Sequence, residues 1–236
     1  MLIIGHRGAK GIARENTFDS FGAAFDSEVD GMEFDVRLTK DNQLIVIHDW
    51  HLTRTHSHPV AVSGLTLKEL RELSSDQLVP TLEEILDIYF GQILLNIEVK
   101  SRGSGEAVVR LLKKKYIKKA SDWNNFFISS LRGSELLHIR KLSTKVNLAL
   151  IHRDNPFMFI AYHRRVKLTA VGFHRLYVNQ FALQIAKKLG LFTYVYTVNR
   201  TAAIPLLQEQ GIDGIITDYP DQFRNYMLNH AEETLL

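Results

Sequence analysis

Histidines, acids and basic residues stand at or near the ends of several apolar, strand-like segments. They are His6, Arg7, Glu33, Asp35, His48, Glu98 and Lys100. Charged side chains are costly inside strands that are buried on both faces, so this repeated placement needs a chemical reason. Metal-assisted cleavage of a phosphate ester requires such a set: carboxylates for a cation, imidazoles for protons, and basic groups for phosphate oxygens.

The three carboxylates could hold one divalent cation. Glu33 and Asp35 are two residues apart, so in a strand both point to the same face, about 6.6 Å apart along the chain. Glu98 ends the following parallel strand, and neighbouring strands lie about 4.8 Å apart. Oxygen ligands in a chain without cysteine favour Mg²⁺ or Ca²⁺ over Zn²⁺, with no preference between the first two. The alternative is that these residues are surface acids at strand ends, or that they form salt bridges with Arg7 and Lys100.

His6 and His48 are the candidates for proton transfer because imidazole titrates near neutral pH. Cleavage of a phosphodiester needs a base that activates the nucleophile and an acid that protonates the departing alkoxide. Two histidines on opposite sides of the phosphate would supply both. Arg7 and Lys100 are expected to neutralise phosphate oxygens, and Glu15 to orient Arg7 or a substrate hydroxyl.

Further candidates lie later in the chain and in the segment after His48. His174 and Tyr196 end two strand-like segments and could contact the alcohol part of a substrate, although core packing also explains Tyr196. His51, His56 and His58 lie in that segment. His56 and His58 could hold a metal, but two histidines two apart without a third partner are a weak signal, and an exposed loop is favoured.

Elements that could position these residues alternate regularly. Strands are expected at 2–5, 31–38, 93–99, 126–130, 146–151, 170–173, 192–198 and 214–217. Helices are expected at 17–27, 81–89, 105–118, 133–142, 156–165, 179–189, 201–210 and 221–230. This alternation predicts a TIM-type (β/α)8 barrel in one catalytic domain spanning residues 1–236. The alternative, an open doubly wound sheet, would gather its site at one switch point.

Residues 44–49 break the alternation. They follow the second strand too closely for a parallel crossover, so we expect an antiparallel hairpin. If Asp41 and Asn42 are the central turn residues, Asp35 faces His48. This register would bring the second histidine back beside the carboxylates.

An insertion follows the hairpin at about residues 50–80. It is expected to contain one short helix of its own, near residues 65–70, and to shape the mouth of the site. At the start of the chain, Asn16 is expected to cap the first helix.

Composition agrees with a globular enzyme. The chain of 236 residues is 45% hydrophobic and 23% charged, with a net charge of +3. The lysines at 113–119 are expected to form a solvated helix face rather than a nucleic-acid site. We expect no stable membrane insertion, because no apolar stretch is long enough. Met1 leads directly into a strand-like segment, so we expect no secretory signal and a cytoplasmic location. The sequence predicts a small-molecule partner and does not predict an oligomeric state.

The chain resembles the glycerophosphodiester phosphodiesterase family through motifs that occur in the family's order. They are His6-Arg7-Gly8, Glu15-Asn16-Thr17, Glu33-Phe34-Asp35-Val36, Thr39-Lys40-Asp41, His48-Asp49, Leu52-Thr53-Arg54-Thr55, Pro80-Thr81-Leu82-Glu83-Glu84, Asn96-Ile97-Glu98-Val99-Lys100, Thr197-Val198-Asn199 and Gly214-Ile215-Ile216-Thr217-Asp218-Tyr219-Pro220. Departures include Asn42 at the usual turn glycine and Tyr196 where tryptophan is common. They affect the expected substrate preference, not the reaction.

The resemblance implies a barrel with a small insertion after the second strand. It also implies a divalent cation on Glu33, Asp35 and Glu98, with His6 and His48 as acid and base. In this family the substrate's glycerol hydroxyl is thought to attack phosphorus and form a cyclic phosphate, which water opens. The expected products are glycerol 3-phosphate and an alcohol.

Two other functions are considered. A related barrel phospholipase acting on lysolipids would need a membrane-facing apolar surface. The candidates for it are Trp50, Phe157, Met158 and Phe159. A non-catalytic phosphate-ester binding protein would be indicated by a missing site residue, and none is missing.

Overall fold

Parallel strands close into a barrel in the computed structural model, which describes residues 1–75 and 78–230. The strands are β1 (Leu2–His6), β2 (Gly31–Leu38), β4 (Leu94–Val99), β5 (Phe126–Ser130), β6 (Leu148–His152), β7 (Ala170–His174), β8 (Phe192–Tyr196) and β9 (Gly214–Thr217). Because β1 pairs with both β2 and β9, these strands leave no open edge. The (β/α)8 barrel is therefore confirmed, and a doubly wound sheet is wrong.

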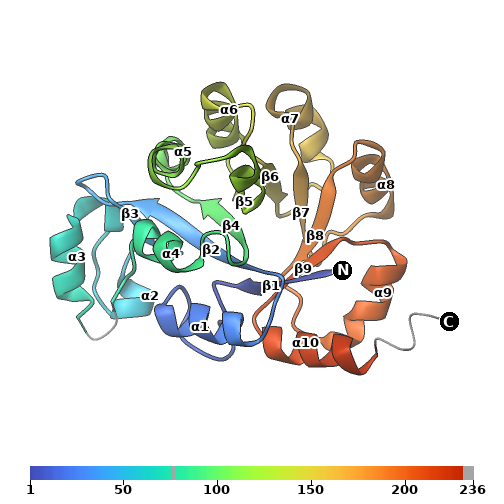
Figure 1. The fold of residues 1–236 in the computed structure, drawn as a ribbon, viewed down its shortest axis with the longest axis horizontal. Helices are drawn as coiled ribbons and strands as arrows, with labels where there is room; N and C mark the ends of the chain where they lie inside the picture. Colours follow the sequence, from blue (N-terminus) through green and yellow to red (C-terminus); the bar gives the residue numbers. More distant parts are fainter. Residues whose placement is uncertain (76–77, 231–236) are drawn as a thin grey trace.

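Helices surround the barrel on its outside (Figure 1). They are α1 (Phe18–Asp26), α4 (Leu82–Tyr89), α5 (Ser104–Lys115), α6 (Gly133–Leu142), α7 (Met158–Val166), α8 (Gln180–Lys188), α9 (Ile204–Glu209) and α10 (Pro220–Asn229). The expected helix at 201–210 is divided, because a 3-10 turn, η3 (Thr201–Ala203), precedes α9. Among the described residues, no helix is long and apolar enough to cross a membrane.

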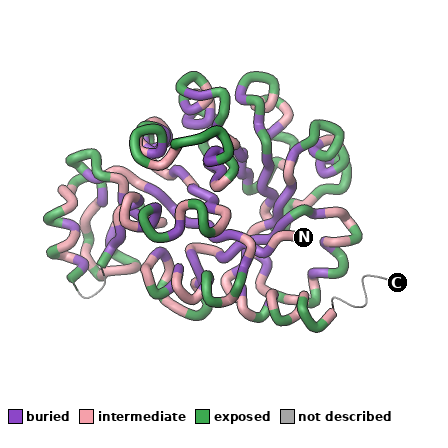
Figure 2. The backbone as a smooth tube through the Cα atoms, in the orientation of Figure 1, coloured by how far each residue is buried: buried purple, intermediate pink, exposed green. Residues whose placement is uncertain are grey.

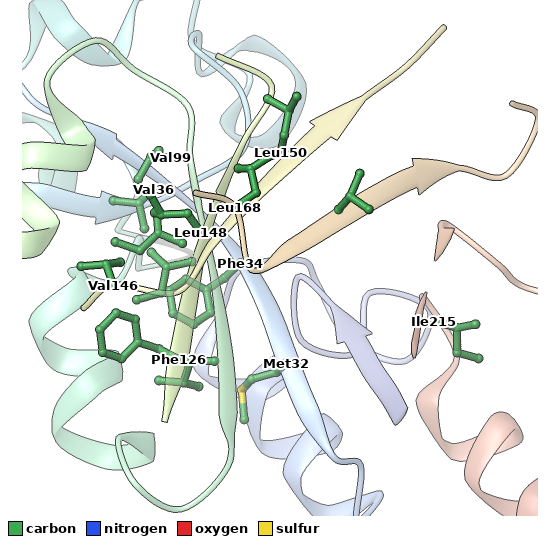
Figure 3. Close-up of a cluster of buried hydrophobic side chains, with 14 of the residues drawn as sticks. Met32, Phe34, Val36, Val99, Phe126, Val146, Leu148, Leu150, Leu168 and Ile215 are labelled. Atoms are coloured by element: carbon green, nitrogen blue, oxygen red, sulfur yellow. The ribbon is translucent and has the colours of Figure 1, made fainter. Parts of the chain in front are cut away.

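Alternation along each strand separates two apolar layers. Met32, Phe34 and Val36 point outward and pack beneath the helices, as Figure 3 shows. The inward residues form a second cluster, in which the rings of Phe127 on β5 and Tyr194 on β8 lie 5.8 Å apart. These strands are not neighbours, so the contact crosses the barrel interior. Buried positions therefore follow the strands and the inner faces of the helices (Figure 2).

The expected hairpin forms, but its register differs by one residue. Strand β3 (Leu44–Val46) pairs antiparallel with β2, and the Ile47 amide donates to the Asp35 carbonyl at 2.9 Å. Asp35 therefore faces Ile47, and the expected pairing with His48 is wrong. The turn is one residue longer than a two-residue hairpin because Asn42 adopts a left-handed conformation with φ of 58°, which its short polar side chain tolerates.

The insertion contains more structure than one helix. Helix α2 (Thr53–His56), a 3-10 turn η1 (Val62–Gly64) and helix α3 (Leu67–Leu73) follow one another. Their apolar residues pack with the hairpin into a small separate core. The expectation of a single helix was wrong because α2 is too short to show a helical period. Residues 76–77 of the expected insertion lie outside the described residues.

Candidate active site

Three carboxylates converge at the carboxyl end of the barrel. Glu33 and Asp35 lie on β2, and Asp35 is directly opposite Glu98 on the neighbouring β4. One oxygen from each lies within 4.8 Å of the others. Glu33 and Asp35 are only 3% and 1% exposed, because they point into the barrel interior. The parallel pairing of β2 and β4 thus places all three acids in one buried cluster.

Two basic groups balance part of this charge. Lys100 Nζ lies 2.6 Å from Glu98 Oε1 and 3.1 Å from Asp35 Oδ1. Arg7 Nε lies 3.3 Å from Asp35 Oδ2, and the Arg7 amide donates to Glu33 Oε2 at 2.9 Å. The predicted salt bridges to Arg7 and Lys100 therefore form, and the three acids also gather in one cluster. The two interpretations of these acids, as cation ligands and as salt-bridge partners, are compatible.

Burial and mutual repulsion set the protonation of the acids. Burial raises the pKa of Glu33 well above its ordinary value, and the nearby charges of Asp35 and Glu98 raise it further. Burial also favours neutral Asp35, but Lys100 and Arg7 outweigh it and hold the pKa of Asp35 far below its usual range. The pKa of Glu98 is raised, mainly by burial. The raised pKa values of Glu33 and Glu98 mean that ionising all three acids together is unfavourable without further positive charge, which a bound cation would supply.

The donor set fits a hard divalent cation. Three carboxylate oxygens within 4.8 Å of one another match the ligand type of Mg²⁺ and Ca²⁺. In addition, the buried Asp35 Oδ1 accepts no hydrogen bond from the described residues, among which its one charged partner is Lys100 Nζ at 3.1 Å. A buried carboxylate oxygen with so few partners suits a metal ligand.

His6, at the end of β1, is held by a carboxylate that the sequence analysis did not single out. Its Nδ1 lies 2.5 Å from Asp218 Oδ1, immediately after β9, and its Nε2 lies 4.0 Å from Glu33 Oε2. Asn199 Nδ2 donates to the other Asp218 oxygen at 2.7 Å. Burial would raise the pKa of Asp218, but the hydrogen bonds from His6 and Asn199 lower it to about 2. Asp218 could have been found as another acid directly after a strand.

His48 has a similar arrangement. Its Nδ1 lies 2.6 Å from Asp49 Oδ1, and Arg54 Nε donates to Asp49 Oδ2 at 2.6 Å. These hydrogen bonds outweigh burial and lower the pKa of Asp49 to about 2. The pKa of His48 is lowered as well, and in this case burial is the main cause. Each histidine therefore has one ring nitrogen fixed by an ionised carboxylate.

Glu15 joins the two sides of the site. Its Oε1 accepts from Arg7 Nη1 at 2.7 Å and from Arg54 Nη2 at 2.6 Å. An unbroken chain of ion pairs therefore runs from Asp35 through Arg7, Glu15 and Arg54 to Asp49. The structure places Glu15 beside Arg7, one of its two expected partners.

Asn16 does not cap the first helix as expected. Thr17 is the cap, and its hydroxyl accepts from the Ser20 amide at 3.2 Å. Asn16 is buried with φ of 58°, and its Nδ2 donates to Asp35 Oδ2 at 3.0 Å. A short amide that tolerates a left-handed conformation therefore supports the acid cluster instead.

An open pocket of about 530 Å³ lies in front of these groups, and both candidate histidines, Glu98 and Lys100 line it. His174 and Tyr196 line its far side, with their rings 5.7 Å apart. The Tyr196 hydroxyl donates to a backbone carbonyl on β6 at 2.9 Å. The position of both residues is thus compatible with contact to a bound substrate.

Other sequence candidates lie elsewhere. The insertion histidines, His51, His56 and His58, do not join the acid cluster. Of the candidates for a membrane-facing apolar surface, Trp50, Phe157 and Met158 are exposed. The inclusion of Phe159 was wrong, because this residue lies on the buried face of α7.

A barrel with a carboxylate cluster and two carboxylate-held histidines at its carboxyl end is typical of a class of hydrolytic enzymes rather than of one protein. The sequence matches the glycerophosphoryl diester phosphodiesterase family over residues 6–222, and the chain belongs to that family.

Individual relatives agree with this assignment. A glycerophosphodiester phosphodiesterase of Caldanaerobacter subterraneus is 30% identical, over 95% of this chain and 96% of its own. The crystal structure of a Thermotoga maritima glycerophosphodiester phosphodiesterase covers 94% of this chain and 96% of its own, with 26% identity and a TM-score of 0.81. An Oleispira antarctica phosphodiesterase, in complex with the product sn-glycerol-3-phosphate, shares the fold, with 22% identity, 96% coverage of both chains and a TM-score of 0.84.

Proposed function

We propose that this protein hydrolyses glycerophosphodiesters to glycerol 3-phosphate and an alcohol, by histidine acid–base catalysis that depends on a divalent cation. Family membership supports the reaction. The observation that carries the mechanism is the meeting of the acid cluster and two carboxylate-held histidines at one pocket. The proposal includes a single catalytic domain and a cytoplasmic location, as the sequence predicts.

Glu33, Asp35 and Glu98 would hold the cation, Mg²⁺ or Ca²⁺. When bound, it supplies positive charge that stabilises the phosphate oxygens as negative charge builds on them. Lys100 is 12% exposed and lines the pocket, so its ammonium group can contact a phosphate oxygen while it stays beside Glu98. Arg7 is fixed by Glu15 and Asp35, which orients its guanidinium group without the cost of ordering it on binding.

The two histidines would divide the proton transfers. Burial lowers the pKa of His48, so the ring is uncharged near neutral pH and can accept a proton from an attacking hydroxyl. The Asp218 carboxylate next to His6 Nδ1 would stabilise the positively charged ring that an acid requires. In each ring the fixed Nδ1 leaves Nε2 as the atom that exchanges a proton with substrate.

His174 and Tyr196 would contact the alcohol that leaves. Both rings lie on the side of the pocket formed by β7 and β8, whereas the acids lie on β2 and β4. The substrate is therefore expected to span the barrel mouth with its phosphate between these two sides.

The proposal is tested by a panel of glycerophosphodiesters assayed with Mg²⁺, with Ca²⁺ and with chelator, and read as released glycerol 3-phosphate. We expect turnover only with a divalent cation, and loss of turnover in Glu33→Ala and His48→Ala. Glu106→Ala is the matched control, because Glu106 is an acid on the outer helix α5 that pairs with Arg110. Full activity of the two site variants, or turnover with chelator, would contradict the mechanism. Saturable binding without product would indicate a binding protein instead.

A further inference from the structure

Exposed apolar side chains gather at the carboxyl end of the barrel, on the loops and first helical turns that follow three successive strands. They are Leu131 after β5, Phe157 and Met158 after β6, and Leu176, Tyr177 and Phe181 after β7, here called the apolar rim. Leu176 and Phe181 are 72% and 64% exposed. The rings of Phe157 and Phe181 lie 6.2 Å apart and join the starts of α7 and α8, which are neighbours in Figure 1, while Leu131, Leu176 and Tyr177 line one pocket. A contiguous patch of this type marks an interaction site more often than scattered exposed residues do.

Arginines accompany the apolar rim in a regular way. Five successive strands, β4 to β8, are each followed within a few residues by an exposed arginine, namely Arg102, Arg132, Arg153, Arg175 and Arg200. Within residues 1–75 and 78–230, none of these arginines forms an ion pair with a carboxylate. By contrast, Arg7 and Arg54 in the site both form ion pairs with carboxylates. The arginines after β4 to β8 are therefore available to an anionic partner.

The partner must satisfy both properties of this surface. A nucleic acid or an acidic protein segment would use the arginines but leave large apolar side chains in water. A second copy of this chain, joined by a two-fold axis, would place the arginines of one copy against those of the other. A membrane that contains anionic lipids offers negative head groups for the arginines and an acyl boundary for the apolar side chains.

We propose that the apolar rim and its arginines dock the mouth of the barrel onto a membrane surface containing anionic lipids. Leu131, Arg153, Leu176 and Tyr177 belong to this surface and also line the pocket. Docking therefore turns the pocket toward the lipid head groups. The proposal concerns binding alone and does not depend on the proposed reaction.

The test is co-sedimentation of the whole protein with vesicles of phosphatidylcholine alone and with vesicles that also contain phosphatidylglycerol. Arg132→Gln and Phe181→Ser change the surface without touching a residue that lines the pocket. Lys145→Gln and Leu228→Ser are the matched controls. Lys145 is exposed just before β6, and Leu228 is 58% exposed near the end of α10, both toward the opposite end of the barrel.

We expect the wild-type protein to bind the phosphatidylglycerol vesicles, to bind neutral vesicles weakly, and to be released by salt. Arg132→Gln should weaken binding roughly fivefold and Phe181→Ser roughly tenfold, while both controls bind as wild type. Equal binding by surface and control variants, or no binding to anionic vesicles, would overturn the proposal. So would a concentration-dependent dimer that Phe181→Ser dissociates, because a second copy would then cover the surface. Vesicle binding is measured without substrate, so its outcome is independent of whether the proposed hydrolysis is found.

Discussion

Replacement of Asp218 by asparagine removes the charge next to His6 while it keeps almost the same side-chain volume. Asp218 Oδ1 lies 2.5 Å from His6 Nδ1, and the pKa of Asp218 is about 2 against an ordinary 3.8. Burial works in the opposite direction, so hydrogen bonds from His6 and Asn199 must produce this decrease. The difference corresponds to a net stabilisation of the ionised carboxylate by about 2.5 kcal/mol.

The catalytic effect follows from the part of this energy that His6 contributes. If that part is about 1.4 kcal/mol, loss of the charge alone lowers kcat roughly tenfold. Asparagine can also donate to Nδ1 and so oppose the doubly protonated ring that an acid requires. In that case the loss approaches about 10⁴-fold, the upper value for a positioned acid–base group. We therefore expect kcat to fall by at least about tenfold, with a smaller change in KM, because Asp218 does not line the pocket.

The assay measures kcat and KM separately, by release of glycerol 3-phosphate from glycerophosphocholine with the divalent cation in excess. Asp213→Asn is the matched control, because Asp213 accepts from the Thr193 amide at 2.7 Å at the opposite end of the barrel. The control should lower Tm but leave kcat unchanged. If folded Asp218→Asn keeps the kcat of the wild-type protein, His6 is not a proton-transfer residue and the reasoning is refuted.

Three further perturbations test other parts of the structure. Glu98→Gln should weaken Mg²⁺ or Ca²⁺ binding, measured by calorimetry without substrate, by at least roughly tenfold; unchanged affinity would exclude Glu98 as a ligand. Arg54→Ala should lower kcat but leave metal affinity intact, because Arg54 pairs with Asp49 and Glu15 and not with the acid cluster; a parallel loss of metal binding would contradict this separation. Burial lowers the pKa of His152 to about 4, so the folded state binds this proton less readily than the unfolded state does. Stability should therefore fall by about 2 kcal/mol as pH decreases from about 7 to about 5. His152→Phe should lose that part of the pH dependence in urea unfolding, and an unchanged profile would show that another group is responsible.

Local sequence patterns determined the barrel and the acid cluster. Strand β2 (Gly31–Leu38) and strand β5 (Phe126–Ser130) have the expected bounds, because their apolar runs end at turn-forming residues. The period of two along a strand put Glu33 and Asp35 on one face, and the parallel neighbour brought Glu98 opposite Asp35. These relations depend on residues close in sequence or on the simplest strand order, so they can be predicted without coordinates.

Only the tertiary structure decided which carboxylate holds His6. Asp218 lies 212 residues from His6, and the two meet because β1 pairs with β9 when the barrel closes. Arg54 reaches Glu15 because the insertion folds back over the first βα loop. A periodic pattern states which face a residue occupies, but not which distant residue shares that face.

The same limit explains the errors at Asn42 and Asn16. Both asparagines adopt left-handed conformations, with φ of 58°, and these single dihedral angles shift the hairpin register and redirect a side chain toward Asp35. Asparagine allows this conformation without requiring it, so the surrounding contacts made the choice. The sequence by itself determined the residue types, the strand period and the order of the elements. Barrel closure and local backbone choices then decided the partners, because both depend on contacts between segments far apart in the chain.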